Sequence, residues 1–249
     1  MDMANRILLA GATGVVGRRL APLLVAAGYE VHGTTRSEAK AALLLQAGVV
    51  PVVVDAFDAD RLRRALVEIR PAAVIHQLTD LPPGLDPGRM AEFLPRNARI
   101  RAEGTRNLVA AALAAGARRL VAQSIAWAYA PAPGPWREDD PLDLAAEGPR
   151  GVTVAGVAAL EDAVLGTPGL EGIVLRYGRL HGPGTGRDEP DEAMPLHVDD
   201  AAAAALLALA RGRPGTYNVA ATEGTLSTAK IRRELGWRPG QAFEAAPAA

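Results

Sequence analysis

The chain of 249 residues has no cysteine and almost no net charge, with a formal value of −1 at pH 7. Without cysteine there is no disulfide framework and no thiolate chemistry, and we expect no metal site. Without an excess of charge, no long-range field draws the protein to nucleic acid or to a membrane surface. We therefore expect a small-molecule ligand and neither of those two partners.

Long apolar segments and targeting signals are also lacking. The longest apolar stretch, residues 201–210, is about half as long as a membrane-spanning helix. The first six residues do not follow the charged-then-apolar plan of a signal peptide, so we expect a cytoplasmic protein. Apolar residues make up 49% of the chain, which supplies one large core. We expect a single domain over 1–249, with at most a small additional lobe.

Glycine is concentrated just after the first apolar segment. Residues 7–17 run through Gly11, Gly14 and Gly17 into a helical pattern. Glycine permits a tight turn and leaves room for a phosphate beside the backbone. The N–H groups that begin the next helix then face the anion, with the helix dipole behind them. The pattern indicates a dinucleotide site, and a glycine-rich turn without a ligand is the alternative.

Strand and helix patterns alternate along the chain. Strands are predicted at 6–10, 29–33, 49–54, 72–76, 120–123 and 173–176, and helices at 15–27, 37–47, 58–69 and 88–115. The strand at 49–54 is continuously apolar, which predicts burial on both faces. Ser37 is expected to cap the helix that follows it. The alternation predicts an α/β fold with a doubly wound (Rossmann) parallel sheet and a ligand at the carboxyl ends of its strands.

Loops rich in proline and glycine interrupt this rhythm after residue 125. We expect a small C-terminal substrate lobe, formed mainly from about 131–150, 182–196 and 220–249. Such loops can form a pocket wall or lid, and ordinary solvent-exposed connections are the alternative.

A series of motifs along nearly the whole chain resembles the extended short-chain dehydrogenase/reductase superfamily, in its epimerase/dehydratase-like branch. The motifs are GATGVVG at 11–17, VD at 54–55, VIHQLT at 74–79, GTRNLV at 104–109, LRYGRLHGP at 175–183, HVDD at 197–200 and LGWRP at 235–239. The resemblance implies a Rossmann fold that binds NAD or NADP. The cofactor-binding residues that it implies are Gly11, Thr13, Gly14, Val15, Val16, Gly17, Asp55, Ala56, Gln77, Leu78, Thr79 and Tyr177.

The end of the second predicted strand bears on the choice of cofactor. Proteins that bind NAD commonly place a carboxylate there, whereas this strand ends in HGTTR at 32–36. Arg36 can pair with a 2′-phosphate, and Thr34, Thr35 and Ser37 can donate to it. A charge-assisted hydrogen bond of this kind contributes about 1.5–3 kcal/mol. We expect NADP in preference to NAD, unless Arg36 is a solvent-exposed surface residue.

The catalytic residues of the superfamily are where this sequence departs from the pattern. The usual proton donor is a Tyr, with a Lys four residues later and commonly a Glu four residues after that. Aligning Glu161 with this Glu places Val157 at the Lys position and Thr153 at the Tyr position, and neither Tyr nor Lys occurs within 130–176. The superfamily also carries an Asn in its long helix. The corresponding position in this sequence is Arg101, and Asn97 lies one helical turn earlier.

Another proton donor is therefore needed for ordinary carbonyl chemistry. We hypothesise that Ser124, at the end of the fifth strand, and Tyr129 together polarise a substrate oxygen. Each also has a structural alternative, because Ser124 can bond to the backbone and Tyr129 can anchor a loop. Thr153 and His181 are further candidates.

Two further histidines, His76 and His197, are expected to be structural. His76 is predicted to lie at the edge of the core. His197 is predicted to cap a helix that begins near residue 198.

Two functions remain open. The chain is an NAD(P)-dependent oxidoreductase or epimerase/dehydratase-like enzyme that acts on a small carbonyl or hydroxyl substrate, or it is a non-catalytic NADP(H)-binding sensor. The segment between 186 and 197 is short, where many relatives carry a longer insertion, and this argues against a large nucleotide-sugar substrate. Monomer and homodimer both remain possible.

Overall fold

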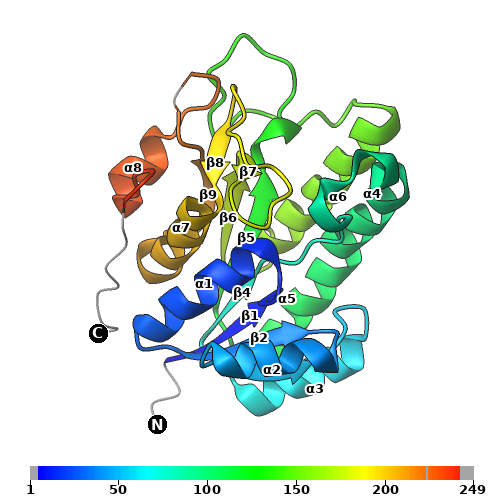
Figure 1. Cartoon of the computed structure of the whole chain (residues 1–249), viewed down its shortest axis with the longest axis vertical. Coiled ribbons are helices and arrows are strands. Elements are labelled where there is room, and N and C mark those ends of the chain that lie inside the picture. Colours follow the sequence, from blue (N-terminus) through cyan, green and yellow to red (C-terminus); the bar gives the residue numbers. More distant parts are fainter. Residues whose placement is uncertain (1–4, 223, 242–249) are drawn as a thin grey trace.

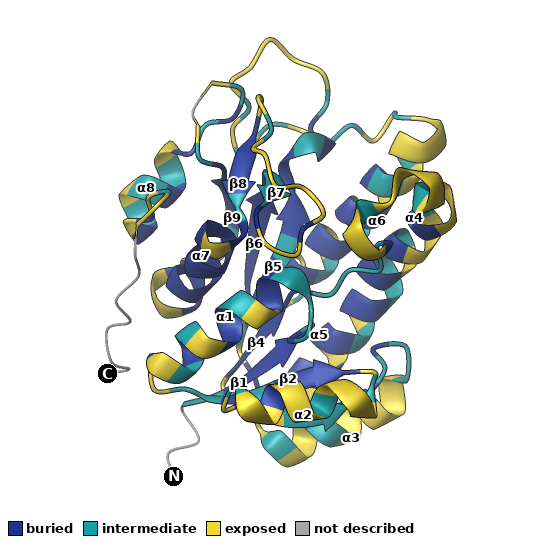
Figure 2. Cartoon of the chain, viewed as in Figure 1, coloured by how far each residue is buried: buried dark blue, intermediate teal, exposed yellow. Residues whose placement is uncertain are grey.

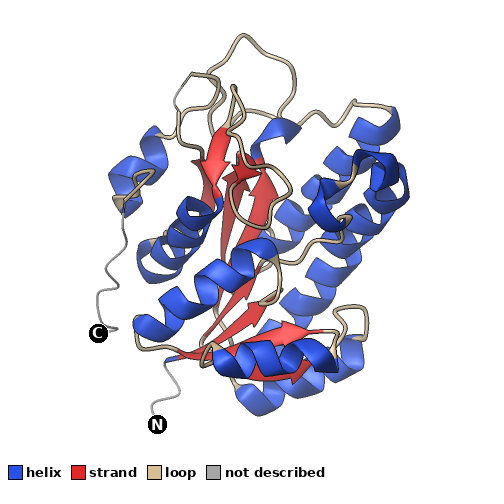
Figure 3. Cartoon of the chain, in the orientation of Figure 1, coloured by secondary structure: helices blue, strands red, loops and turns tan. Residues whose placement is uncertain are grey.

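The computed structural model describes residues 5–222 and 224–241. Within them the chain forms a seven-stranded sheet in the order β3-β2-β1-β4-β5-β6-β9, in which every neighbouring pair is parallel. The strands are β1 (Arg6–Ala10), β2 (Glu30–Thr35), β3 (Val50–Val53), β4 (Ala73–His76), β5 (Arg119–Ile125), β6 (Glu171–Tyr177) and β9 (Gly215–Val219). Helices lie on both faces of the sheet (Figures 1 and 3), which confirms the predicted doubly wound fold.

Two hydrophobic clusters hold these helices to the sheet. The helices are α1 (Val15–Ala26), α2 (Glu38–Gln46), α3 (Ala59–Ile69), α4 (Met90–Arg99), α5 (Thr105–Ala114), α6 (Gly148–Leu165), α7 (Val198–Arg211) and α8 (Ala229–Leu235). Side chains alternate across a strand, so Ile7 and Leu9 pack towards α1 and α7, while Leu8 packs towards α3, α5 and α6. Figure 2 shows the resulting buried centre.

The sheet changes direction between β1 and β4, because β1 is followed by β2 on one side and flanked by β4 on the other. In doubly wound sheets, ligands bind outside the carboxyl ends of the strands at such a switch point. The ends of β1, β2 and β4 therefore mark where a site is expected.

Two local predictions were wrong. Strand β3 lies at the edge of the sheet and pairs only with β2, so its residues are only partly buried and Val50 is exposed. An apolar run shows only that the side chains are apolar. The position of the strand in the sheet decides how far these side chains are buried. Ser37 precedes α2, but its side chain makes no capping hydrogen bond. Its backbone N–H donates to Thr35 Oγ1 instead.

The helix predicted at 88–115 is interrupted. It consists of α4, a π-helical turn at Ile100–Gly104, and α5. Such π-turns inside helices are frequent at functional sites. Strand β9 and the two-stranded parallel ribbon of β7 (Arg179–His181) and β8 (Pro195–His197) were not predicted from the sequence.

The segments assigned to the small lobe meet one another on one side of the sheet. Trp136 and Leu226 form a parallel bridge, and Met194, Tyr129 and Leu226 share a small hydrophobic cluster. Part of the expected lobe, residues 223 and 242–249, lies outside the described residues. Trp237 is buried against the main core, where its Nε1 donates to the carbonyl of Asp200 at 3.0 Å.

In the described part of the chain, no helix is both long and apolar enough to cross a membrane.

Candidate functional site

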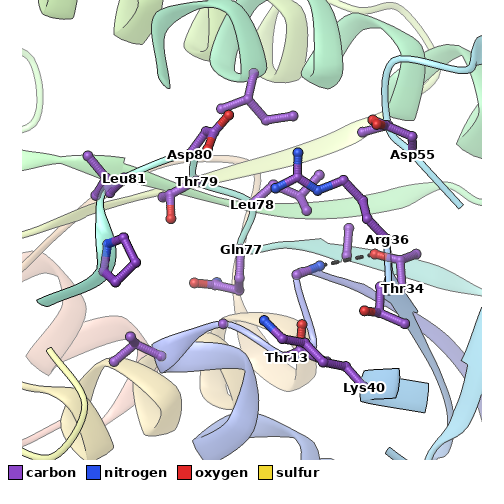
Figure 4. Close-up of a pocket in the computed structure, with 18 of the residues that line it drawn as sticks. Thr13, Thr34, Arg36, Lys40, Asp55, Gln77, Leu78, Thr79, Asp80 and Leu81 are labelled. Atoms are coloured by element: carbon purple, nitrogen blue, oxygen red, sulfur yellow. Dashed lines mark hydrogen bonds between the residues drawn. The ribbon is translucent and has the colours of Figure 1, made fainter. Parts of the chain in front are cut away.

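A cavity of about 340 Å³ opens at the carboxyl ends of β1, β2 and β4. Its wall contains ten of the residues implied for the cofactor, namely Gly11, Thr13, Gly14, Val15, Arg36, Asp55, Ala56, Gln77, Leu78 and Thr79. Figure 4 shows Arg36, Thr34 and Asp55 together at one end and Gln77, Thr79 and Leu81 further along. The predicted residues thus meet in one place, although they come from separate strand ends.

The glycine turn leaves no room for side chains. Gly11 has a φ of +85°, and a Cβ there would lie 2.7 Å from the carbonyl oxygen of Gln77. A Cβ on Gly17 would meet the carbonyl oxygen of Gly11. Helix α1 starts at Val15 without a side-chain cap, so the first N–H groups of the helix are left for an anion. This cradle fits the pyrophosphate of a dinucleotide.

Two cations stand at the β2 end of this cavity. Arg36 and Lys40 both line it, and neither side chain has a hydrogen bond or ion pair with another described residue. Thr34 and Thr35 also line the cavity, and Thr34 Oγ1 accepts from the Gly11 N–H at 3.1 Å. Ser37 does not line it. Lys40 was missed from the sequence because it follows the strand by five residues and only the first turn of α2 brings it back.

Asp55 follows β3 in the same cavity. Its Oδ1 accepts from the Phe57 N–H at 3.0 Å, which holds the carboxylate in place. The Asn107 amide donates to the Ala56 carbonyl at 2.9 Å and ties this turn to α5. These two hydrogen bonds fix the turn that places Asp55 and Ala56 in the wall of the cavity.

Gln77 at the end of β4 has an unsatisfied acceptor. Its Nε2 donates to the Tyr177 hydroxyl at 3.3 Å, and that hydroxyl donates to the carbonyl of Ala201 at 3.1 Å. The Gln77 Oε1 is buried and has no partner in the structure. A buried acceptor without a partner costs free energy, so this atom fits a donor supplied by a ligand.

A second cavity, of about 390 Å³, adjoins the first. The residues that line both are Val15, Gln77, Thr79, Leu81, Leu85 and Thr185. Val16 and Tyr177, both expected at the cofactor, lie on the wall of the second cavity. The two cavities therefore share a wall at the carboxyl end of β4.

Ser124 lies on the wall of this second cavity, but its hydroxyl is already engaged. Its Oγ donates to Glu161 Oε1 at 2.7 Å. The same carboxylate is held by Arg176 through contacts of 3.0 and 2.7 Å. Burial opposes the charged form of Arg176, yet the hydrogen bonds and charge of Glu161 raise its pKa above the ordinary value. Ser124 can still accept a hydrogen bond from a substrate.

Tyr129 does not reach either cavity among the residues that the structure describes. Its side chain is buried, its hydroxyl donates to Asn218 Oδ1 at 2.6 Å, and its ring stacks on Trp136. Burial raises the pKa of the phenol to about 12. The geometry does not support the hypothesis that Ser124 and Tyr129 act together, because the phenol is held among lobe residues.

The other candidate donors have structural partners. Thr153 lines the second cavity and donates to the Pro149 carbonyl at 3.1 Å, while Val157 is fully buried. His181 lies against the ring of His197 and lines neither described cavity. His197 caps α7, because its Nδ1 accepts from the Asp199 N–H, as predicted.

His76 is buried and satisfied, in agreement with its predicted structural role. Its Nε2 bonds with Thr105 Oγ1 at 2.8 Å and its Nδ1 accepts from the Leu78 N–H at 3.1 Å. Burial, with a smaller contribution from the charge of Arg101, lowers the pKa of His76 to about 4.

Comparisons with known proteins agree with this fold. The model of the NAD dependent epimerase/dehydratase family matches residues 7–196. A 3-diazoavenalumate denitrifying reductase from a Streptomyces species is 42% identical over 241 residues, which cover 86% of this chain and 75% of that protein.

Solved structures share the fold at lower identity. A UDP-glucose 4-epimerase from Thermotoga maritima has a TM-score of 0.75 and 18% identity, and the match covers 96% of this chain and 95% of the other. The UDP-glucose 4-epimerase of Thermus thermophilus, in complex with NAD, has a TM-score of 0.72, 23% identity and the same coverage. The chain therefore belongs to the NAD-dependent epimerase/dehydratase family, whose cofactor is a nicotinamide dinucleotide.

Proposed function

We propose that the chain is an NADP-dependent reductase that delivers a hydride to a small conjugated substrate bearing a diazonium group. The observation that carries the proposal is the chemistry of the second cavity. Its titratable wall residues, among those described, are Arg101, Arg179, Arg187 and Tyr177, and burial raises the pKa of Tyr177 above its ordinary value. No His, Asp, Glu or Lys of the described chain lies on this wall.

A carbonyl or hydroxyl substrate does not suit such a wall. A carbonyl must gain a proton as the hydride arrives, and a positioned general acid usually supplies it. The positions where the superfamily carries Tyr and Lys hold Thr153 and Val157, and neither can act as that acid. A substrate whose reduction needs no proton from the protein fits better.

Diazonium reduction has this property. When bound, NADPH supplies the hydride that replaces dinitrogen on an aromatic ring, so that the ring gains hydrogen, N2 leaves and NADP⁺ forms. The residues of this chain then have to bind and orient the substrate and exclude water. Leu81, Leu94, Ile125 and Trp127 provide an apolar wall for a flat ring. The relative named as a denitrifying reductase of a diazo compound supports the proposal.

The β2 end of the first cavity supports NADP as the cofactor. Arg36 and Lys40 are free of protein partners among the described residues and lie where the sequence lacks the acid typical of NAD binding. A 2′-phosphate there would receive two charge-assisted contacts.

Stoichiometry tests the proposed reaction. Purified protein with NADPH and 4-carboxybenzenediazonium should oxidise one NADPH for each N2 released and form benzoate. The control for uncatalysed reduction is the Gly14→Asp variant, in which a carboxylate faces the pyrophosphate and cofactor binding is lost. NADPH oxidation with 4-formylbenzoate but not with the diazonium would instead show a carbonyl reductase.

A non-catalytic NADP(H) sensor is the second candidate, and the same lack of His, Asp, Glu and Lys on the described wall favours it. Tight binding of NADPH without oxidation of NADPH by diazonium, carbonyl or sugar substrates would identify the chain as a sensor.

A further inference from the structure

The second cavity contains a buried cation that has no partner in the protein. Arg101 lies on its wall and is only 5% exposed. No hydrogen bond or ion pair joins its guanidinium to any residue that the structure describes. The carboxylate whose charge acts on Arg101 is that of Glu161, but Arg176 and Ser124 already occupy Glu161.

Burying an arginine without a partner is costly. Burial lowers the pKa of Arg101 to about 10, which leaves it charged at neutral pH. A side chain in this position is stabilised when an anion enters the cavity. The π-turn at Ile100–Gly104 holds Arg101 within the helix that faces the cavity.

A second buried donor stands beside it on the same helix. Asn97, which is also 5% exposed, lines the cavity four residues before Arg101. Its Oδ1 accepts from the Asp80 N–H at 2.9 Å. The amide NH2 of Asn97 therefore points away from the Asp80 N–H, and none of the described residues accepts a hydrogen bond from it.

The charges around the cavity favour an anion as well. Arg179 and Arg187 line it in addition to Arg101, and no described Asp or Glu does. Arg179 and Arg187 are half-exposed, and each forms an ion pair with Asp191 at 3.3 Å. Arg101 therefore differs from the other two by being deep and unpaired.

We propose that Arg101, assisted by Asn97, binds the carboxylate group of the substrate and so makes the enzyme selective for small conjugated carboxylic acids. A guanidinium presents two parallel N–H groups that match the two oxygens of a carboxylate. The apolar wall formed by Leu81, Leu94 and Trp127 accommodates the rest of the molecule. The inference rests on the proposed function only in taking the second cavity as the substrate site.

Binding of a matched pair of probes tests the assignment without any turnover. Cinnamate and cinnamamide have nearly the same shape but differ in charge. With NADP⁺ bound, calorimetric titration should show saturable binding of cinnamate at least tenfold tighter than that of cinnamamide. Arg101→Gln should lower the affinity for cinnamate at least tenfold and leave the affinities for cinnamamide and NADP⁺ unchanged.

Two further variants serve as controls. Arg106→Gln removes an exposed charge from α5, close to Arg101 in sequence, and should leave cinnamate binding unchanged. Arg101→Lys keeps the charge but loses the two parallel N–H groups, so its affinity for cinnamate should be intermediate. It also provides the measurement if Arg101→Gln does not fold.

The proposal is overturned if cinnamate and cinnamamide bind equally, or if cinnamate shows no saturable binding at millimolar concentration. It is also overturned if Arg101→Gln and Arg101→Lys both retain wild-type affinity, or if phenyl phosphate binds more tightly than cinnamate. Because no reduction is measured, a failure of the diazonium assay with cinnamate binding intact would reject the reaction and leave the carboxylate site standing.

Discussion

Arg176 on β6 holds Glu161 on α6 through two nitrogen–oxygen contacts of 3.0 and 2.7 Å, with both side chains almost fully buried. The pair links the sheet to α6, the helix that also carries Thr153 and Val157. It also takes up the hydroxyl of Ser124. This pair therefore has a structural role beside the second cavity.

Removing one charge of this pair should be costly. Glu161→Gln leaves the Arg176 guanidinium buried without its counter-charge, and we expect the free energy of unfolding to fall by about 3–5 kcal/mol. Urea denaturation measures this change. As a control, Glu103→Gln breaks the exposed pair with Arg99 and should leave the urea midpoint nearly unchanged. Equal midpoints for the two variants would contradict the prediction.

Tyr129→Phe separates a structural role from a catalytic one. The change leaves Asn218 Oδ1 without its donor, so we expect a loss of about 1–3 kcal/mol in unfolding free energy. Turnover with NADPH should stay near that of the wild type, because the phenol does not line the described cavities. A roughly 10²-fold fall in kcat at unchanged stability would instead assign the phenol to the reaction.

Cofactor preference should depend on the two unpaired cations. Arg36→Ala should weaken NADPH at least tenfold and leave NADH nearly unchanged, since only NADPH carries the 2′-phosphate. Lys40→Ala should act in the same direction, and the double variant should bind the two cofactors about equally. Fluorescence titration measures both affinities for each variant. Equal losses for NADPH and NADH would mean that these residues do not contact the phosphate.

Stability should fall in mild acid because His76 resists protonation in the folded protein. Its pKa is about 4 when folded and about 6.5 when unfolded, so the unfolded chain binds more protons between these values. The contribution of His76 to the free energy of unfolding is therefore complete above pH 6.5. It is lost as the pH falls to about 4, and the total loss is about 3 kcal/mol. Against His76→Asn, which cannot titrate, the wild type should lose this amount over that range in urea denaturation. Parallel pH profiles would show that His76 is not the cause.

The strand–turn–helix at residues 6–26 could be predicted because its signals are local. An apolar strand, spaced glycines and an amphipathic helix follow one another in the chain, whereas the cofactor residues expected after β3 and β4 were taken from the resemblance to the superfamily. The position of β3 could not be predicted in this way. Whether an apolar strand is central or at an edge depends on pairings with distant segments.

The assignment of Tyr129 shows the same limit at the site. The sequence places Tyr129 four residues after β5, close enough to turn back towards the cavity. The structure turns it towards Asn218 on β9, 89 residues later, and a strand that was not predicted thus determined where the hydroxyl points.

The sequence by itself determined the fold class, because the alternation of strand and helix patterns depends on residue types at short spacing. Only the tertiary structure decided which polar groups remain without partners. The described part of the structure shows three such groups: Lys40 beside Arg36, the unsatisfied Gln77 Oε1 and the buried Arg101. A free hydrogen-bonding group is a property of its whole surroundings, and segments far apart in the chain supply those surroundings.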